Sequence, residues 1–347
     1  MASPSAAQEL VNTPPATPAF DIMRAAFVEL QVVDLAASEH FYAELLGMIV
    51  SARTDDAIFL RGWEERQHHS LILRRAPSAA ASRLGFRVRN EDDLDRLHAL
   101  AGARDLTVRW SDPGIDPGMG RSLRIWDPFG YPLEFFHAIE QFETQHQRFD
   151  LHRGAPILRF DHLNLHTPRV EDTFRFWLTM GFCCTEYIST DDAENERITG
   201  AWMRRKPTVH DVALTAGTGP RLHHFAYWVA EPAGVLRACD QLAGGYHSDV
   251  IERGPGRHGV SNAFFVYLRD PDGHRIELYS CDYYTGDPDH KPLRWSVTDP
   301  RCRSFWGARA PGSWYDESSL LVGPDGETVP IAPANVDERA QHTEVLA

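Results

Sequence analysis

Hydrophobic and polar positions near the start of the chain predict a strand followed by a helix. Residues 27–33 alternate large apolar and polar side chains, which is typical of a strand. Apolar residues then recur at helical spacing over 41–46, and Gly47 is a helix stop signal. Two more strands are predicted at 123–126 and 133–136, because a turn sequence separates these apolar runs.

The second half of the chain repeats this plan. Residues 159–166 predict a strand. Thr167 is a residue type favoured at a helix N-cap, and Pro168 is favoured at the first helical position. Apolar residues at helical spacing follow over 174–178, and the half ends in a strand at 275–279. We therefore predict a helix that begins at Pro168 and a strand order like that of the first half.

A shared motif shows that the two halves are copies of one unit. An Asp-Pro-x-Gly turn begins at Asp127 and a second one at Asp270, and a glutamate, Glu134 or Glu277, follows seven residues later in both. The repeat spans about 120 residues, and a fixed internal period is the signature of duplicated architecture. The sequence predicts an α+β fold made of tandem strand–helix–strands repeats.

Composition and charge limit the kinds of molecule that this chain is expected to bind. The 347 residues are 43 % hydrophobic and 24 % charged, as in an ordinary globular protein. The formal net charge of −14 makes nucleic acids and anionic membranes poor partners, because the long-range field repels them. No apolar run is long enough to span a bilayer, and the first twenty residues lack the Lys or Arg of a secretory signal. Five cysteines without a C-x-x-C spacing favour a reducing, cytoplasmic setting.

The repeat alignment isolates candidate metal ligands in the second half. It pairs His162 with Glu29, His224 with Gly85, and Glu277 with Glu134. Two imidazoles and one carboxylate on one face leave about three open positions on a six-coordinate ion, as in non-haem Fe(II) oxygenases. The carboxylate lies between Ile and Leu in an apolar strand, where it needs a metal or an ion-pair partner. The pattern alone leaves both explanations open.

Three segments carry a resemblance to a known family. They are residues 251–264, IERGPGRHGVSNAF; residues 270–277, DPDGHRIE; and residues 282–288, DYYTGDP. From about residue 24 to 325, the chain resembles the type I extradiol ring-cleaving dioxygenases of the vicinal oxygen chelate superfamily. The resemblance implies two open mixed-sheet barrels and a covering segment at the C-terminus.

The resemblance also implies roles for individual residues. His162, His224 and Glu277 match the metal ligands, and the match favours His224 over the adjacent His223, between which spacing does not choose. The implied metal is Fe(II), with Mn(II) as an alternative. The remaining matches surround the substrate: the acid/base residue His210, the substrate-oxygen partners Tyr267 and His258, the pocket residues Asn164 and Trp202, and the carboxylate-binding Arg253 and Arg303.

The implied activity is cleavage of 3,4-dihydroxyphenylacetate with O2 to 5-carboxymethyl-2-hydroxymuconate semialdehyde, in aromatic-compound catabolism, by a homotetramer. Another catechol is an alternative, because Cys302 precedes Arg303 where close members carry two arginines. A non-catalytic small-molecule-binding member of the superfamily is a second alternative. A glyoxalase-type isomerase or lyase, with ligands such as Glu29 and Glu134 from the first half, is a third.

These observations together predict how the chain is divided. The predicted parts are a disordered leader over 1–23, rich in Ala, Pro, Ser and Thr; an N-terminal repeat domain without metal over 24–150; a C-terminal catalytic repeat domain with metal over 151–286; and a lid and tail over 287–347.

Overall fold

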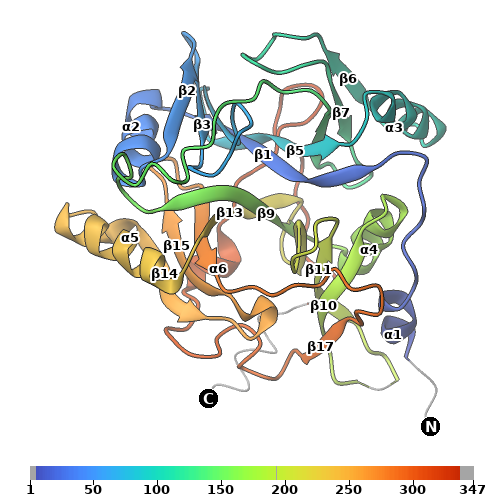
Figure 1. The fold of residues 1–347 in the computed structure, drawn as a ribbon. Helices are drawn as coiled ribbons and strands as arrows, with labels where there is room; N and C mark the ends of the chain where they lie inside the picture. Colours follow the sequence, from blue (N-terminus) through green and yellow to red (C-terminus); the bar gives the residue numbers. More distant parts are fainter. Residues whose placement is uncertain (1–4, 193, 337–347) are drawn as a thin grey trace.

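Two large mixed sheets form the centre of the molecule in the computed structural model, which describes residues 5–192 and 194–336 (Figure 1). The first sheet contains β1 (Ile22–Val32), β2 (Ile49–Arg53), β3 (Ala57–Arg61), β4 (Leu71–Arg75), β5 (Ala80–Val88), β6 (Val108–Ser111), β7 (Ser122–Trp126) and β8 (Pro132–Phe136). The second contains β9 (Ile157–Thr167), β10 (Cys183–Ser189), β11 (Ile198–Arg204), β12 (Val212–Ala216), β13 (Arg221–Val229), β14 (Ile251–Arg257), β15 (Phe264–Arg269), β16 (Arg275–Ser280) and β17 (Leu293–Ser296).

The two sheets have the same topology. Strand order is β2-β3-β4-β1-β5-β8-β7-β6 in the first and β10-β11-β12-β9-β13-β16-β15-β14 in the second, with β17 added beside β10. In both, the first strand of the repeat pairs parallel with one neighbour and antiparallel with the other. The tandem duplication and the open mixed sheets predicted from the sequence are confirmed.

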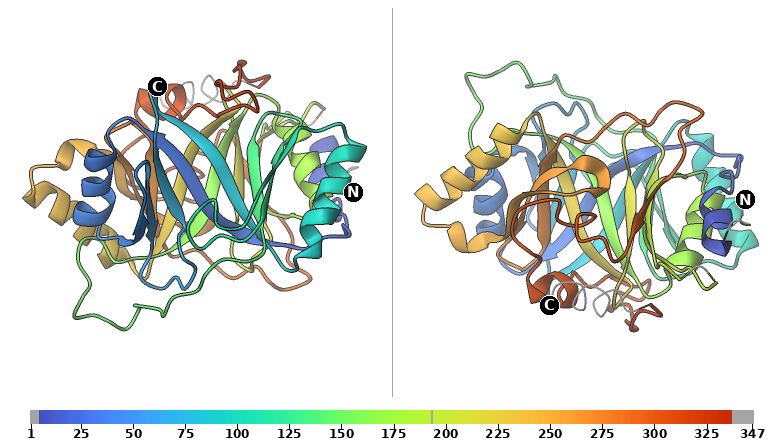
Figure 2. Two further views of the ribbon diagram at one scale, coloured as in Figure 1. Left: turned by 90° about the horizontal axis from the view of Figure 1, so that it is seen from above. Right: turned by 90° about the horizontal axis from the view of Figure 1, so that it is seen from below.

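The helices lie mainly at two ends of the sheets (Figure 2). They are α1 (Ala6–Val11), α2 (Leu35–Glu39), α3 (Asp92–Ala103), α4 (Val170–Thr179), α5 (Pro232–Gly244) and α6 (Gly312–Asp316), with a π-helical turn η1 (His40–Leu45) after α2 and short 3-10 turns η2 (Ser248–Val250) and η3 (Val260–Asn262). Helices α2 and α5 lie at one end, and α1, α3 and α4 at the other. None of the helices in the described ranges is long and apolar enough to cross a membrane.

Two local predictions are wrong. The helix predicted to begin at Pro168 begins at Val170, because Thr167 still pairs with Ala216 at the end of β9. The leader predicted to be disordered forms α1 within its described residues. Ser5 and Gln8 make a capping box there, and the buried side chains of this helix join the main hydrophobic core.

Contacts between the sheets fix one against the other. The Ala25 backbone N–H of β1 donates to Asp211 Oδ1 at 2.9 Å, and Tyr42 Oη donates to Asp270 Oδ2 at 3.0 Å. Both carboxylates belong to the second half, so each holds a group of the first half in place. The sheets are therefore one packed body around their shared core.

The C-terminal segment crosses both sheets. β17 pairs with β10, Ser319 forms a bridge with Leu222 of β13, and Leu321 forms one with Ala81 of β5. The segment predicted as a lid and tail thus contacts both halves. The division at residues 150 and 286 stays a prediction, which separate expression of residues 24–150 would test.

Candidate metal centre

Three adjacent strands bring His162, His224 and Glu277 together. Ala226 of β13 pairs with His162 of β9 on one side and with Glu277 of β16 on the other. His224 lies two residues before Ala226, and residues two apart on a strand face the same side of the sheet. The small Ala226 side chain therefore leaves space between the two imidazoles and the carboxylate.

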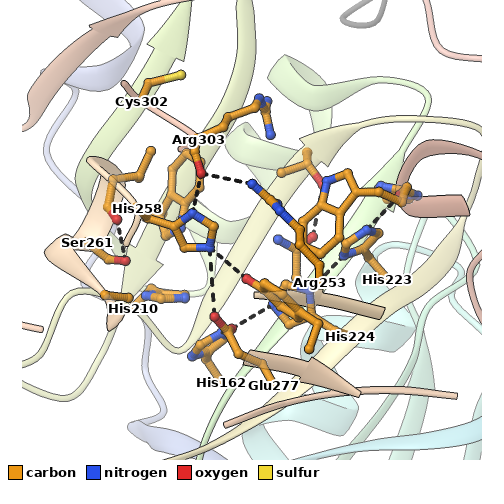
Figure 3. Close-up of a pocket in the computed structure, with 18 of the residues that line it drawn as sticks. His162, His210, His223, His224, Arg253, His258, Ser261, Glu277, Cys302 and Arg303 are labelled. Atoms are coloured by element: carbon orange, nitrogen blue, oxygen red, sulfur yellow. Dashed lines mark hydrogen bonds and ion pairs between the residues drawn. The ribbon is translucent and has the colours of Figure 1, made fainter. Parts of the chain in front are cut away.

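The ligand-type atoms of these three residues converge (Figure 3). His162 Nε2 lies 3.1 Å and His224 Nε2 lies 3.2 Å from Glu277 Oε2. One atom from each residue lies within 4.8 Å of the others, and all three side chains are buried. Across residues 5–192 and 194–336, this is the one group of three or more such side chains close enough to hold a metal ion.

The pKa values of His224 and Glu277 favour the protonation states that bind a cation. Burial lowers the pKa of His224 to about 4, so its imidazole is neutral. Burial opposes ionisation of Glu277, yet the contacts of its carboxylate with His162 and His224 hold its pKa well below the usual range. A neutral imidazole and an ionised carboxylate are the ligating forms of these groups. The donor set thus fits a divalent metal with open coordination positions.

His162 has an anionic partner behind it. Its Nδ1 atom lies 3.0 Å from Asp161 Oδ2, which also accepts a hydrogen bond from Tyr279 Oη. Burial disfavours the charged form of His162, but Asp161 and Glu277 raise its pKa overall. With its proton on Nδ1, the ring presents the Nε2 lone pair to the centre of the site.

All ten residues predicted for the site line one cavity. Further residues also line the cavity: His166, Thr215, His223, Val260, Ser261, Ala263, Cys302, Trp314 and Tyr315. Trp314 and Tyr315 lie on α6, and no local motif in the sequence marks that segment as part of the site.

His258 and Tyr267 form a hydrogen-bonded pair whose direction is determined. His258 Nδ1 contacts the backbone carbonyl of Arg303, which only accepts, so the ring proton is on Nδ1. Burial and the nearby Arg253 lower the pKa of His258 to about 3, so the ring is neutral. Tyr267 Oη therefore donates to His258 Nε2 across 2.9 Å.

His210 packs against a metal-ligand candidate. Its ring centroid lies 3.8 Å from that of His162, and its side chain is buried. Burial and the neighbouring His162 hold the pKa of His210 well below its usual range. The buried Nδ1 atom has no hydrogen-bond partner among the described residues, so this neutral imidazole retains an unused polar atom beside the centre.

Arg253 connects the cavity wall to the C-terminal segment. Its Nη2 atom donates to the Arg303 carbonyl at 3.0 Å and to Ser304 Oγ at 2.8 Å. The guanidinium lies 4.4 Å from the Trp314 ring centroid. Its Nε atom is buried and has no partner within the described residues, so a donor stays available in the cavity wall.

The equivalent place in the first sheet is filled differently. Glu29 contacts Arg83 and Arg74 in buried or half-buried ion pairs. The strand registers put Phe27 and Arg83 where the second sheet has His162 and His224, because Phe27 is opposite Gly85 as His162 is opposite Ala226. The alignment of His162 with Glu29 and of His224 with Gly85 is therefore wrong, whereas that of Glu277 with Glu134 is confirmed. Guanidinium groups therefore supply the positive charge in this sheet, and the candidate ligands come from the second sheet alone.

The family model for the Glyoxalase/Bleomycin resistance protein/Dioxygenase superfamily matches residues 24–135 and 159–278. The chain belongs to this superfamily. The two matched segments correspond to the two repeats, and the second contains all three candidate ligands.

Relatives place the chain among the extradiol ring-cleaving dioxygenases of the superfamily. A manganese-dependent 2,3-dihydroxybiphenyl 1,2-dioxygenase of Geobacillus genomosp. 3 is 34 % identical, over 82 % of this chain and 94 % of the relative. A metapyrocatechase of Geobacillus stearothermophilus is 31 % identical, over 86 % and 94 %. Homoprotocatechuate 2,3-dioxygenase of Brevibacterium fuscum, in its 3,4-dihydroxyphenylacetate complex, superposes with a TM-score of 0.88 at 44 % identity, over 92 % of this chain and 99 % of that one.

These likenesses agree with the geometry of the cavity. Extradiol dioxygenases cleave catechols with O2 at a catalytic divalent metal, and this chain presents a buried group of two histidines and one glutamate. All five cysteines of this extradiol dioxygenase are free.

Proposed function

We propose that this extradiol dioxygenase cleaves 3,4-dihydroxyphenylacetate with O2, giving 5-carboxymethyl-2-hydroxymuconate semialdehyde. The observation that carries the proposal is the pair Arg253 and Arg303 in the wall of the cavity that contains the candidate ligands. A buried guanidinium favours an anionic substituent, because charge-assisted hydrogen bonds to a carboxylate are strong. The orphaned Nε donor of Arg253 needs such an acceptor.

In this proposal His162, His224 and Glu277 would hold Fe(II), with Mn(II) as the alternative, and about three coordination positions would stay open for the two catechol oxygens and O2. When bound, the metal stabilises the catecholate and provides a path for electrons from the ring to O2. The name of the Geobacillus relative as manganese-dependent keeps Mn(II) in consideration.

The remaining side chains orient the substrate and move protons. Tyr267 and His258 hydrogen-bond the substrate oxygens, and their mutual hydrogen bond fixes both groups in position before the substrate arrives. His210 exchanges a proton with the reduced oxygen through its imidazole, whose buried Nδ1 atom has no hydrogen-bond partner among the described residues. Asn164 and Trp202 shape the pocket beside the ring.

A substrate panel tests the proposal. Purified metal-loaded enzyme is given 3,4-dihydroxyphenylacetate, catechol and 2,3-dihydroxybiphenyl, and O2 uptake and product spectra are recorded. We expect a yellow semialdehyde from the acid, with one O2 consumed per substrate and the highest kcat/KM of the three. Preference for a neutral catechol would assign the alternative substrate class, and binding without turnover would assign a non-catalytic role. Light scattering tests the implied homotetramer in the same preparation.

A further inference from the structure

A bulge in β13 turns two consecutive histidines toward the same cavity. Residues next to each other on a regular strand face opposite sides of the sheet. In the pairing of β13 with β9, Leu222 is opposite Leu165 and His224 is opposite Asn164, so one extra residue, His223, is inserted. A bulge redirects a side chain, and bulges are common beside active sites. Both His223 and His224 consequently line the cavity.

His223 links a candidate metal ligand to the C-terminal segment. His224 Nδ1 lies 2.7 Å from His223 Nδ1, and His223 Nε2 lies 2.9 Å from the backbone carbonyl of Trp314 (Figure 3). The Trp314 ring packs edge-on against His223, with centroids 4.4 Å apart. The chain of hydrogen bonds therefore runs from the centre of the site to α6.

One assignment of protons satisfies every member of this chain. The Trp314 carbonyl only accepts, so His223 Nε2 carries a hydrogen. A neutral imidazole has one N–H group, so His223 Nδ1 accepts and His224 Nδ1 donates. That leaves the Nε2 lone pair of His224 directed at the site it shares with Glu277, which is the tautomer a metal ligand requires.

Arg275 fixes the segment that ends the chain of hydrogen bonds. Its fully buried guanidinium donates to the His223 carbonyl at 3.0 Å, to the Ser313 carbonyl at 3.1 Å and to the Glu317 carbonyl at 3.2 Å. One side chain therefore joins the β13 bulge to both ends of α6. The Trp314 carbonyl is held at a defined position relative to His223.

We propose that His223 is a positioning residue for the metal ligand His224, and that α6 thereby forms part of the metal centre. The inference rests on the proposed function, since it requires His224 to ligate a metal. The two imidazole ligands then have different supports: His162 donates to the Asp161 carboxylate, and His224 donates to a neutral imidazole tied to Trp314. Partners of this kind commonly contribute 10–100-fold in metal affinity.

Two amide variants separate the hydrogen bond of His223 with His224 from its hydrogen bond with Trp314. In His223→Asn the amide oxygen takes the place of Nδ1 and still accepts from His224. In His223→Gln the amide reaches the position of Nε2, so it contacts Trp314 and leaves His224 Nδ1 without an acceptor. His223→Phe keeps the ring shape and removes both contacts. The matched control is His274→Phe, because His274 also ties the C-terminal segment, through Ser319 Oγ at 2.6 Å, without contacting His224.

The measurement is the Mn(II) dissociation constant of each full-length variant, by chelator competition, with thermal unfolding of the metal-free forms as a check on folding. We expect weakening of about 10–100-fold for His223→Phe and His223→Gln, a smaller loss for His223→Asn and none for His274→Phe. Wild-type affinity in His223→Gln, or equal losses in His223→Asn and His223→Gln, would overturn the inference. Should the phenylalanine variant not fold, the two amides still decide. Absence of Mn(II) binding in the wild type would instead contradict the proposed function.

Discussion

The partner of each ring nitrogen determines what the histidines in this cavity do. His162 donates to Asp161 and His258 donates to the Arg303 carbonyl, so each presents its other nitrogen to the cavity. His210 differs, because its Nδ1 atom has no partner among the described residues. Hydrogen bonds therefore distinguish two rings held in one tautomer from one ring able to exchange a proton.

His210→Asn tests that distinction. We expect turnover to fall by about 100-fold or more, because a proton carrier is removed, while metal per subunit stays at the wild-type level. Stopped-flow absorbance and plasma emission measure the two quantities. Loss of metal together with activity would show that His210 acts as a ligand or a structural support.

Arg303→Met tests the substrate's charge. Loss of a charge-assisted contact of about 1.5–3 kcal/mol raises KM for 3,4-dihydroxyphenylacetate roughly tenfold to a hundredfold. KM for the neutral 4-methylcatechol should change little, because a remote anchor affects only the substituent that it binds. Arg253→Met should impair both substrates, since Arg253 also holds the backbone at residues 303–304. Equal losses on both substrates in Arg303→Met would assign a structural role to Arg303.

At the scale of elements, the site is built by strand pairing and by the contacts of Arg275 that hold α6. The sequence pattern located β9 and β16 and the candidate ligands that they carry, because alternation and the internal repeat survive in the residues themselves. It left His223 and His224 unresolved, because the bulge that turns both inward depends on pairing with β9. Trp314 and the helix α1 were missed for a related reason: their positions are fixed by tertiary packing, which short-range pattern does not encode.

Arg275, which holds α6 in place, is itself paired with Glu252, and this ion pair predicts that the stability of the fold depends on pH. Burial opposes ionisation of Glu252, but Arg275 and Arg269 lower its pKa from 4.5 to about 2. Its carboxylate therefore stabilises the fold fully above pH 4.5, and this contribution is lost as the pH falls toward 2. Urea unfolding of Glu252→Gln should show lower stability at pH 6 and a flatter decline between pH 4.5 and 2.

The control for that measurement is Glu317→Gln. Glu317 pairs with Arg269 from an exposed position, so its replacement should leave stability at pH 6 nearly unchanged. If the free energy of unfolding declined equally for the wild type and Glu252→Gln between pH 4.5 and 2, the stabilising role assigned to the Glu252 carboxylate would be contradicted.

At the scale of the whole molecule, a duplicated fold has one half specialised for chemistry. Both sheets have the same strand order, yet the first holds Phe27, Arg83 and Glu134 where the second holds His162, His224 and Glu277. The first half contributes core and supporting contacts, such as that of Ala25 with Asp211. The central claim is therefore that metal binding depends on three residues of the second sheet and on none at the equivalent places of the first.

Metal per subunit, measured by plasma emission, tests this claim most directly. The proteins compared are the wild type, His162→Ala, His224→Ala, Glu277→Ala and, as the first-sheet control, Glu134→Gln, each loaded with Fe(II) and desalted. We predict close to one metal per subunit in the wild type and the control, and close to none in the three ligand variants, because two ligands do not hold the ion against water and buffer. Near-full occupancy in any two of those three variants would contradict the account.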